Sequence, residues 1–141
     1  MALLNMGVKA ATKRMPKVIS PRTHAILDYA TAGGFLLGAA LFWRNHRRAA
    51  IGSLVCGLVE VGTAMTTDYP GGVVDGGMSF ETHGKVDTVF GPTVGMLPNL
   101  MAFGDDPHAN FFRGQALAMT AVIGLTDWDA EEKRPGRRRV A

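Results

Sequence analysis

Long uncharged stretches alternate with short polar segments along this chain. Four such stretches cover residues 29–43, 49–67, 88–104 and 114–126. The second stretch contains a single charged residue, Glu60. They are too long for typical strands and show no strict alternation of apolar and polar positions, so each stretch predicts a helix. The segments between them, WRNHRR, YPGGVVDGG and GDDPHAN, have the composition of turns. The pattern therefore predicts an all-α fold with four helices.

The polar positions repeat with a fixed offset. Residues 20–29 (SPRTHAILDY) and 79–88 (SFETHGKVDT) share Ser, Thr, His and Asp at positions that differ by 59 in each case. The same offset relates TDY at 67–69 to TDW at 126–128. Duplication of a two-helix unit explains this regularity. We predict a basic N-terminal arm (1–19), a first helical hairpin (20–69), a glycine-rich loop (70–78), a second helical hairpin (79–128) and a basic C-terminal tail (129–141).

Glycine is frequent within the expected helices, and the whole chain contains 18 glycines in 141 residues. In a helix of a soluble protein each glycine costs about 1 kcal/mol relative to alanine. In a membrane, small residues let helices approach closely. The pairs Gly34/Gly38 and Gly91/Gly95 have the spacing that places both members on one helix face. We therefore predict a bundle of four transmembrane helices, with a soluble four-helix bundle as the alternative.

Positive charge is concentrated toward the two ends of the chain. Residues 1–48 hold eight Lys and Arg, residues 133–139 hold five, and residues 49–112 hold only Lys85. Cations that flank apolar segments favour contact with lipid head groups, and the interleaved aromatic residues of a nucleic-acid-binding face are missing. We expect the lipid bilayer and other membrane subunits, or further copies of the chain, as partners, and no nucleic acid. The charge distribution predicts an integral membrane protein with both termini in the cytoplasm.

The repeated motif begins with a signal for the start of a helix. Ser20 followed by Pro21, and the matching Ser79, predict helix N-caps. A His and an Asp follow in each copy, four residues apart, and they therefore share one face of the helix. These residues are His24 and Asp28 in the first copy and His83 and Asp87 in the second.

Asp68 and Asp127 end the second helix of each expected hairpin. A helical rise of about 1.5 Å per residue brings them to the same end of the bundle as the repeated His and Asp. The interpretation that we favour is a structural clasp in which His24 pairs with Asp68 and His83 pairs with Asp127. The alternative is a site for haem, a chlorin or a metal ion, held by His24, Asp28, His83 and Asp87.

Glu60 lies near the middle of the second helix, where an ionisable group suggests a functional site. It either lines an ion path together with Asn99 or forms a structural hydrogen bond. Cys56 is the only cysteine, which excludes an internal disulfide and a thiolate zinc site. His46 and His108 fall in expected loops, where we expect them to be solvated. No arrangement of nucleophile and base is evident, so the favoured interpretation includes no catalytic residue, no metal site, no cofactor and no enzymatic activity.

The pattern S-P-x-T-H-x-x-x-D-Y, followed by T-D-Y-x-G-G-V and a second T-H-x-x-x-D, resembles the SPW-repeat family of small bacterial membrane proteins. The resemblance covers about residues 20–128, although the chain has no Ser-Pro-Trp tripeptide. It implies a membrane domain of two repeats and four helices in a bacterial inner membrane, and it implies no particular activity. We therefore expect a structural or accessory subunit of a larger membrane complex, such as a bioenergetic one, with a haem-, chlorin- or metal-binding membrane protein as the alternative.

Overall fold

The computed structural model describes residues 15–130 of the chain. The described residues form four helices and no strand apart from two isolated bridges, which confirms the expected all-helical fold. Most of the expected basic arm (residues 1–14) and of the basic tail (residues 131–141) lies outside the described residues. The helices are α2 (Pro21–Phe42), α3 (Arg47–Thr66), α4 (Phe80–Leu100) and α5 (Ala109–Leu125).

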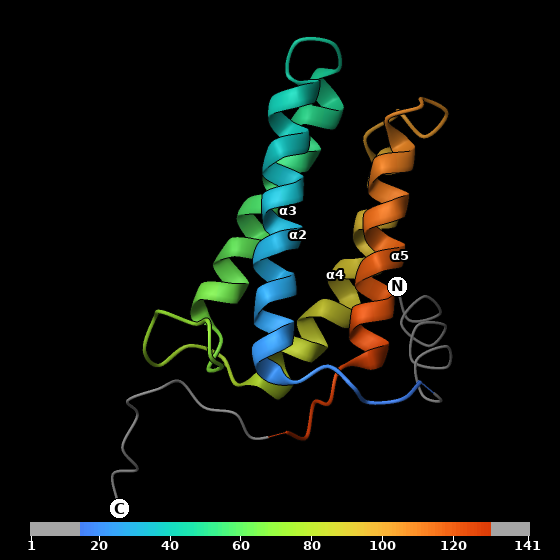
Figure 1. The fold of residues 1–141 in the computed structure, drawn as a ribbon. Helices are drawn as coiled ribbons and strands as arrows, with labels where there is room; N and C mark the ends of the chain where they lie inside the picture. The colour runs from blue at the N-terminus through green and yellow to red at the C-terminus, as the bar shows by residue number, and fades with distance from the viewer. Residues whose placement is uncertain (1–14, 131–141) are drawn as a thin grey trace, which may run out of the picture.

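The helices form two hairpins that stand side by side (Figure 1). Helix α2 packs mainly on α3, and α4 packs mainly on α5. The connections 43–46 and 101–108 lie at one end of the molecule, which we call the hairpin-loop end. The start of α2, the connection 67–79 and the end of α5 lie at the opposite end, which we call the junction end.

Serine N-caps set the start of the first helix in each hairpin. The Ser20 hydroxyl accepts the backbone N–H of Thr23 at 3.3 Å, and the Ser79 hydroxyl accepts that of Thr82 at 3.2 Å. Pro21 occupies the first turn of α2, where a missing N–H costs nothing. Because of these caps, α2 and α4 begin eight residues before the uncharged stretches at 29 and 88, and they include the repeated His and Asp.

Backbone hydrogen bonds join the two hairpins at the junction end. Ile19, which precedes α2, forms a parallel bridge with Thr126, which follows α5. Met78, which precedes α4, forms the equivalent bridge with Thr67, which follows α3. The same offset of 59 positions relates the two bridges, since 78 minus 19 and 126 minus 67 both equal 59. Each hairpin therefore begins beside the end of the other one.

The four glycines that the sequence assigns to helix packing all face α5. A Cβ at Gly34 would lie 3.1 Å from Gln115, and one at Gly38 would lie 2.8 Å from the ring of Phe111. Gly91 approaches Met119 and Ile123, and Gly95 approaches Ala116. Small residues on α2 and α4 thus let α5 pack closely against helices of both hairpins.

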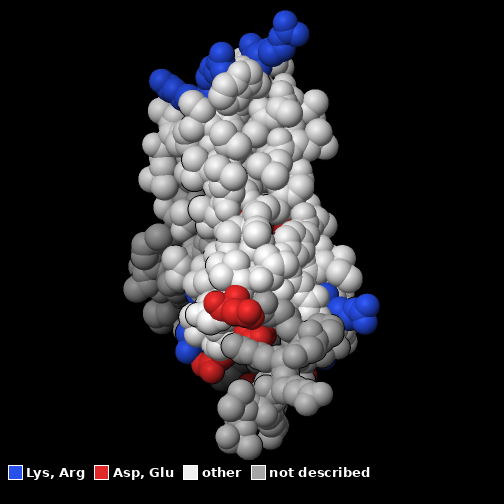
Figure 2. Space-filling view, turned by 90° about the vertical axis from the view of Figure 1, so that its left-hand side faces the viewer, with Lys and Arg blue, Asp and Glu red and all other residues white. Residues whose placement is uncertain are grey.

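The outer surface between the two ends carries many large apolar side chains. Leu37, Leu41, Leu58 and Leu117 are all exposed, and Leu117 is exposed to 73%. Figure 2 shows charged side chains gathered at the two ends of one face, with an almost uncharged band between them.

Within the described residues, α2 and α3 are long and apolar enough to cross a membrane, although a buried helix of a soluble protein meets the same criteria. The other two helices do not pass this test, and α5 has only 17 residues. Of the four expected spanning helices, the two of the first hairpin are therefore candidates by length and composition.

We predict that Gly38→Ala lowers the stability of the protein, because the new Cβ would meet the Phe111 ring at 2.8 Å and the Ser53 hydroxyl at 3.2 Å. Overpacking of this kind typically costs about 1–3 kcal/mol. The matched control is Gly33→Ala in the same helix, because a Cβ there meets nothing within 4 Å. Thermal unfolding in detergent, followed by circular dichroism, measures both variants. Equal melting temperatures for the two variants would contradict the proposed close approach of α2 and α5.

Candidate functional site

Four buried side chains meet between the hairpins at the junction end. His24 and Asp28 come from α2, His83 and Asp87 come from α4, and none is more than 5% exposed. We call these four residues the His/Asp cluster. Their candidate ligand atoms all lie within 4.8 Å of one another.

The two imidazoles face each other through their Nε2 atoms, which lie 3.3 Å apart. The Oδ2 atom of Asp87 lies 3.2 Å from Nε2 of His24 and 3.1 Å from Nε2 of His83. Asp28 places Oδ1 3.2 Å from Nε2 of His24 and Oδ2 3.3 Å from Nε2 of His83. Each carboxylate therefore contacts both histidines, one of which belongs to the other hairpin.

Two threonine hydroxyls fix the orientation of the imidazole rings. The Thr126 hydroxyl donates its single proton to the carbonyl of Val122 at 2.7 Å, so it accepts a hydrogen bond from Nδ1–H of His24 at 2.8 Å. The repeat-related Thr67 hydroxyl donates to the carbonyl of Thr63 at 2.6 Å and accepts from Nδ1–H of His83 at 2.8 Å. The proton of each neutral imidazole is thus on Nδ1, and the lone pair is on Nε2, inside the cluster.

This arrangement requires positive charge at its centre. Two neutral imidazoles would point lone pairs at each other across 3.3 Å and at two carboxylates as well. Buried carboxylates without a counter-ion are strongly unfavourable. Two protons, held between the Nε2 atoms and the carboxylates, or one divalent metal ion balance the two negative charges of Asp28 and Asp87.

Aromatic side chains enclose the cluster. The ring centroid of Trp128 lies 4.8 Å from that of His24, and the Phe80 centroid lies 5.5 Å from it. Tyr69 is fully buried and donates its hydroxyl proton to Oδ2 of Asp28 at 2.6 Å. Burial, followed by the negative charge of Asp28, raises the pKa of Tyr69 far above its usual value, so the phenol remains a donor. Trp128, at the repeat position of Tyr69, instead donates its indole N–H to the carbonyl of Ile123 at 3.1 Å.

The observed contacts differ from the clasp that the sequence suggested. The expected pairs, His24 with Asp68 and His83 with Asp127, lie within single hairpins. The nitrogens of both rings instead contact the His/Asp cluster and the two threonines. The reason is that each hairpin begins beside the end of the other one, an arrangement that we call the crossed connection. It places Thr126 beside the start of α2 and Thr67 beside the start of α4. The backbone N–H group of Asp68 donates to the carbonyl of Met78, and that of Asp127 donates to the carbonyl of Ile19.

Glu60 and Asn99, which the sequence placed on one candidate ion path, lie in different parts of the molecule. Glu60 is 3% exposed and lines a small cavity together with Asp28 and Asp87. Asn99 is exposed near the end of α4 and lines an open pocket of about 640 Å³ at the hairpin-loop end. Glu60 therefore belongs beside the His/Asp cluster, and Asn99 does not.

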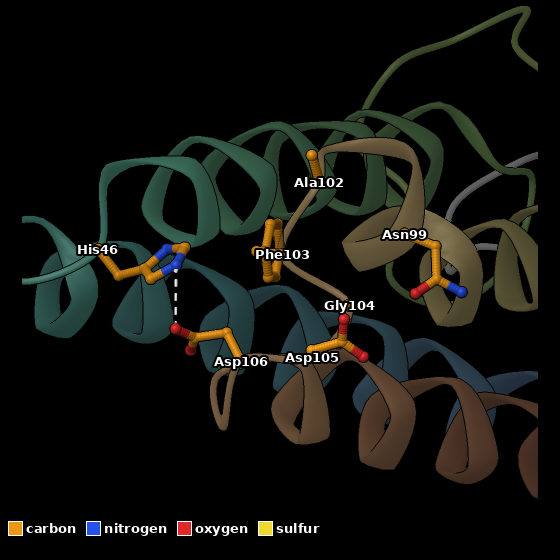
Figure 3. Close-up of a pocket in the computed structure, with 7 residues that line it drawn as sticks. All are labelled: His46, Asn99, Ala102, Phe103, Gly104, Asp105 and Asp106. Atoms are coloured by element: carbon orange, nitrogen blue, oxygen red, sulfur yellow. Dashed lines mark ion pairs between the residues drawn. The ribbon is translucent and has the colours of Figure 1, made fainter.

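The open pocket lies beside a second group of ionisable side chains, which the sequence did not reveal. His46 and Asp106 line this pocket, and their side chains point toward each other (Figure 3). The Nε2 atom of His46 lies 3.5 Å from Oδ2 of Asp106, and His108 contacts the other carboxylate oxygen. The backbone N–H of His108, followed by its imidazole, lowers the pKa of Asp106. His46 and His108 are half-buried rather than solvated, in contrast to the expectation.

The second group is less suited to a metal ion than the His/Asp cluster. Nδ1 of His46 accepts the backbone N–H of Ala49 at 3.0 Å and so caps α3. The proton of a neutral ring is then on Nε2, the atom that faces Asp106. A metal ion on Nε2 would require the ring to give up this helix cap. The local bonding therefore favours a hydrogen-bonded group here and a ligand site at the His/Asp cluster.

Comparison of the chain with known protein families, curated proteins and solved structures finds no match.

We predict that Tyr69→Phe destabilises the protein, because the buried Asp28 carboxylate loses a donor at 2.6 Å while the aromatic packing is kept. A hydrogen bond to a charged group typically contributes about 1.5–3 kcal/mol. Tyr29→Phe is the matched control, because the Tyr29 hydroxyl donates to the Gly71 carbonyl at an exposed site. Chemical unfolding in detergent measures both variants. A loss for Tyr69→Phe no larger than that for Tyr29→Phe would argue against a buried anionic Asp28.

Proposed function

We propose that this chain is a small integral membrane protein in which the His/Asp cluster binds one divalent transition-metal ion and thereby holds the two hairpins together. The observation that carries the proposal is the convergence of two Nε2 lone pairs and two carboxylates from both hairpins on one buried point. The oriented imidazoles distinguish this site from an ordinary cluster of polar side chains.

The spacing of the ligand atoms supports a metal ion of ordinary size. A tetrahedral site with bonds of about 2.0–2.1 Å has ligand atoms about 3.3–3.4 Å apart. The five nitrogen–nitrogen and nitrogen–oxygen separations within the cluster range from 3.1 to 3.3 Å. The two separations to Asp28 involve different oxygens, so an ion at the centre also needs a rotation of this carboxylate that brings one oxygen toward both imidazoles.

The donor set narrows the identity of the ion. Two imidazoles and two carboxylates suit zinc, iron or manganese. Thr126 and Thr67 accept hydrogen bonds from the Nδ1–H groups of the two imidazoles, and Tyr69 donates one to Asp28. Metal ligands commonly have such outer hydrogen-bond partners. A haem or chlorin fits the site poorly, because the carboxylates of Asp28 and Asp87 lie where a macrocycle would need space between the imidazoles.

The exterior of the helices supports insertion into a membrane. Helices of 20 to 22 residues, such as α2, α3 and α4, are about 30 Å long, which matches the hydrocarbon thickness of a bilayer. The exposed leucines and the uncharged band of Figure 2 provide the apolar surface that lipid would cover. The buried ionisable groups of the bundle face its interior, as polar residues of membrane helices do.

Four protein ligands complete a tetrahedral coordination shell, which is typical of structural metal ions. The proposal therefore agrees with a protein that has no enzymatic activity of its own. It also agrees with an accessory role in a larger membrane complex, for which the exposed apolar faces offer contact surface.

A second candidate is the same accessory membrane protein with two protons in place of the metal ion. It is favoured by the contacts of the imidazoles, since two imidazoliums and two carboxylates give a cluster with no net charge. The two candidates differ in one property, which is whether the folded protein binds a metal ion at the cluster.

We predict that the full chain, extracted in mild detergent and stripped with a chelator, binds zinc tightly, and that His24→Ala and His83→Ala each weaken binding at least about 100-fold. Each substitution removes one of the four ligands. Isothermal titration calorimetry measures the affinity. Binding should also weaken as the pH falls, because protons on Nε2 compete with the metal ion.

His46→Ala is the matched control for these substitutions, since His46 is a half-buried histidine outside the His/Asp cluster. It should leave the affinity for zinc unchanged. Wild-type protein that binds no zinc would exclude the metal-binding proposal and leave the proton-filled clasp. Equal losses in all three variants would show that zinc binds elsewhere.

A further inference from the structure

The carboxylate of Glu60 is the buried ionisable group that the proposed metal site leaves unexplained. Its side chain projects from the middle of α3 and is 3% exposed. Among the described residues, its Oε2 atom has no hydrogen-bond partner. A buried, unpartnered carboxylate oxygen is costly and calls for an explanation.

The cavity beside Glu60 adjoins the His/Asp cluster. Its volume is about 10 Å³, and its polar lining consists of Glu60, Asp28, Asp87 and Thr31. Apolar side chains close the remaining sides: Leu27, Met119, Val122 and Ile123. The space is about that of one water molecule or one ion.

The two aspartates face both the histidines and this cavity. Asp87 contacts both imidazoles through the same oxygen, Oδ2. A carboxylate that binds one ion with one oxygen can bind a neighbouring ion with the other, at a typical separation of about 3.5–4 Å between the two ions. The cavity therefore has three carboxylates. Asp87 contacts the imidazoles through Oδ2 alone, whereas Asp28 contacts them through both oxygens and would share one of these with the second ion.

The balance of charge points in the same direction. One divalent ion in the His/Asp cluster neutralises Asp28 and Asp87, so an ionised Glu60 would have no counter-ion in its apolar setting. A divalent cation within the cavity would offset this negative charge, with one positive charge in excess over the three carboxylates, and would give Oε2 a partner.

We propose that Glu60, Asp28 and Asp87 form a second cation site next to the first, which takes a hard divalent ion such as Mn²⁺ or Mg²⁺. Oxygen ligands alone are the set that these ions prefer. The inference rests on the proposed function, because the two aspartates bridge both ions. The protein is then a two-metal membrane protein in which helices α2, α3 and α4 each contribute ligands.

The test is the stoichiometry of Mn²⁺ bound by the full chain in detergent. Chelator-stripped protein is saturated with Mn²⁺, freed of unbound ion by gel filtration, and analysed for metal content and by electron paramagnetic resonance. We expect two Mn²⁺ per wild-type chain with a spin-coupled signal. For Glu60→Gln, which keeps the shape and removes the charge, we expect one Mn²⁺ with an uncoupled signal.

Ser53→Ala is the matched control, because Ser53 lies in the same helix and its buried hydroxyl also has no hydrogen-bond partner among the described residues. It should keep two Mn²⁺. A single ion in the wild type would overturn the second site and leave the proposed function intact. No bound Mn²⁺ would also overturn the second site, and the zinc titration would then decide the proposed function separately. Two ions in Glu60→Gln would show that the second ion does not depend on the negative charge of Glu60, which would overturn its proposed role. The wild-type count stands even if this variant fails to fold.

Discussion

The structure depends on the compensation of two buried negative charges where the hairpins meet. Asp28 and Asp87 lie on different helices, and each contacts the imidazoles of both hairpins at 3.1–3.3 Å. Each carboxylate contacts the histidine of its own hairpin and the histidine of the other hairpin. The cluster therefore makes the association of the hairpins specific, while the apolar contacts of Phe35, Val94 and Phe112 add hydrophobic burial farther along the bundle.

The crossed connection at the junction end makes this geometry follow from a duplicated sequence. The bridge of Ile19 with Thr126 brings a threonine hydroxyl to His24, and the repeat-related bridge of Met78 with Thr67 does the same for His83. A single sequence unit, used twice, thus supplies a capped helix start, an oriented imidazole, a carboxylate and the hydroxyl that orients the imidazole of the other unit. The two halves of the cluster differ at the repeat-related positions Tyr69 and Trp128. Of the two aspartates, Asp28 accepts a hydrogen bond from the Tyr69 phenol, whereas the Trp128 indole donates to the carbonyl of Ile123.

Much of this fold follows from local sequence signals, whereas the site depends on tertiary connections. The serine caps predicted where α2 and α4 begin, and the spacing of four residues placed His24 and Asp28 on one face. The partners of the histidines were not predictable in this way. Within its own hairpin, the expected partner of His24 is Asp68, but the crossed connection places Thr126 of the other repeat next to it. The position of Glu60 beside the cluster has the same origin. Its burial agrees with its place in an apolar stretch, but its neighbours on α2 and α4 depend on the packing of both hairpins.

The most direct test of the account is X-ray absorption spectroscopy on the full chain in detergent after loading with one equivalent of zinc. We expect a zinc ion with two imidazole nitrogens and two oxygens at about 2.0–2.1 Å, since His24, His83, Asp28 and Asp87 supply the ligands. In His83→Ala the contribution of one imidazole should be lost. A spectrum of hydrated zinc with six oxygen ligands and no imidazole would contradict the account, and the cluster would then be a clasp held by protons alone.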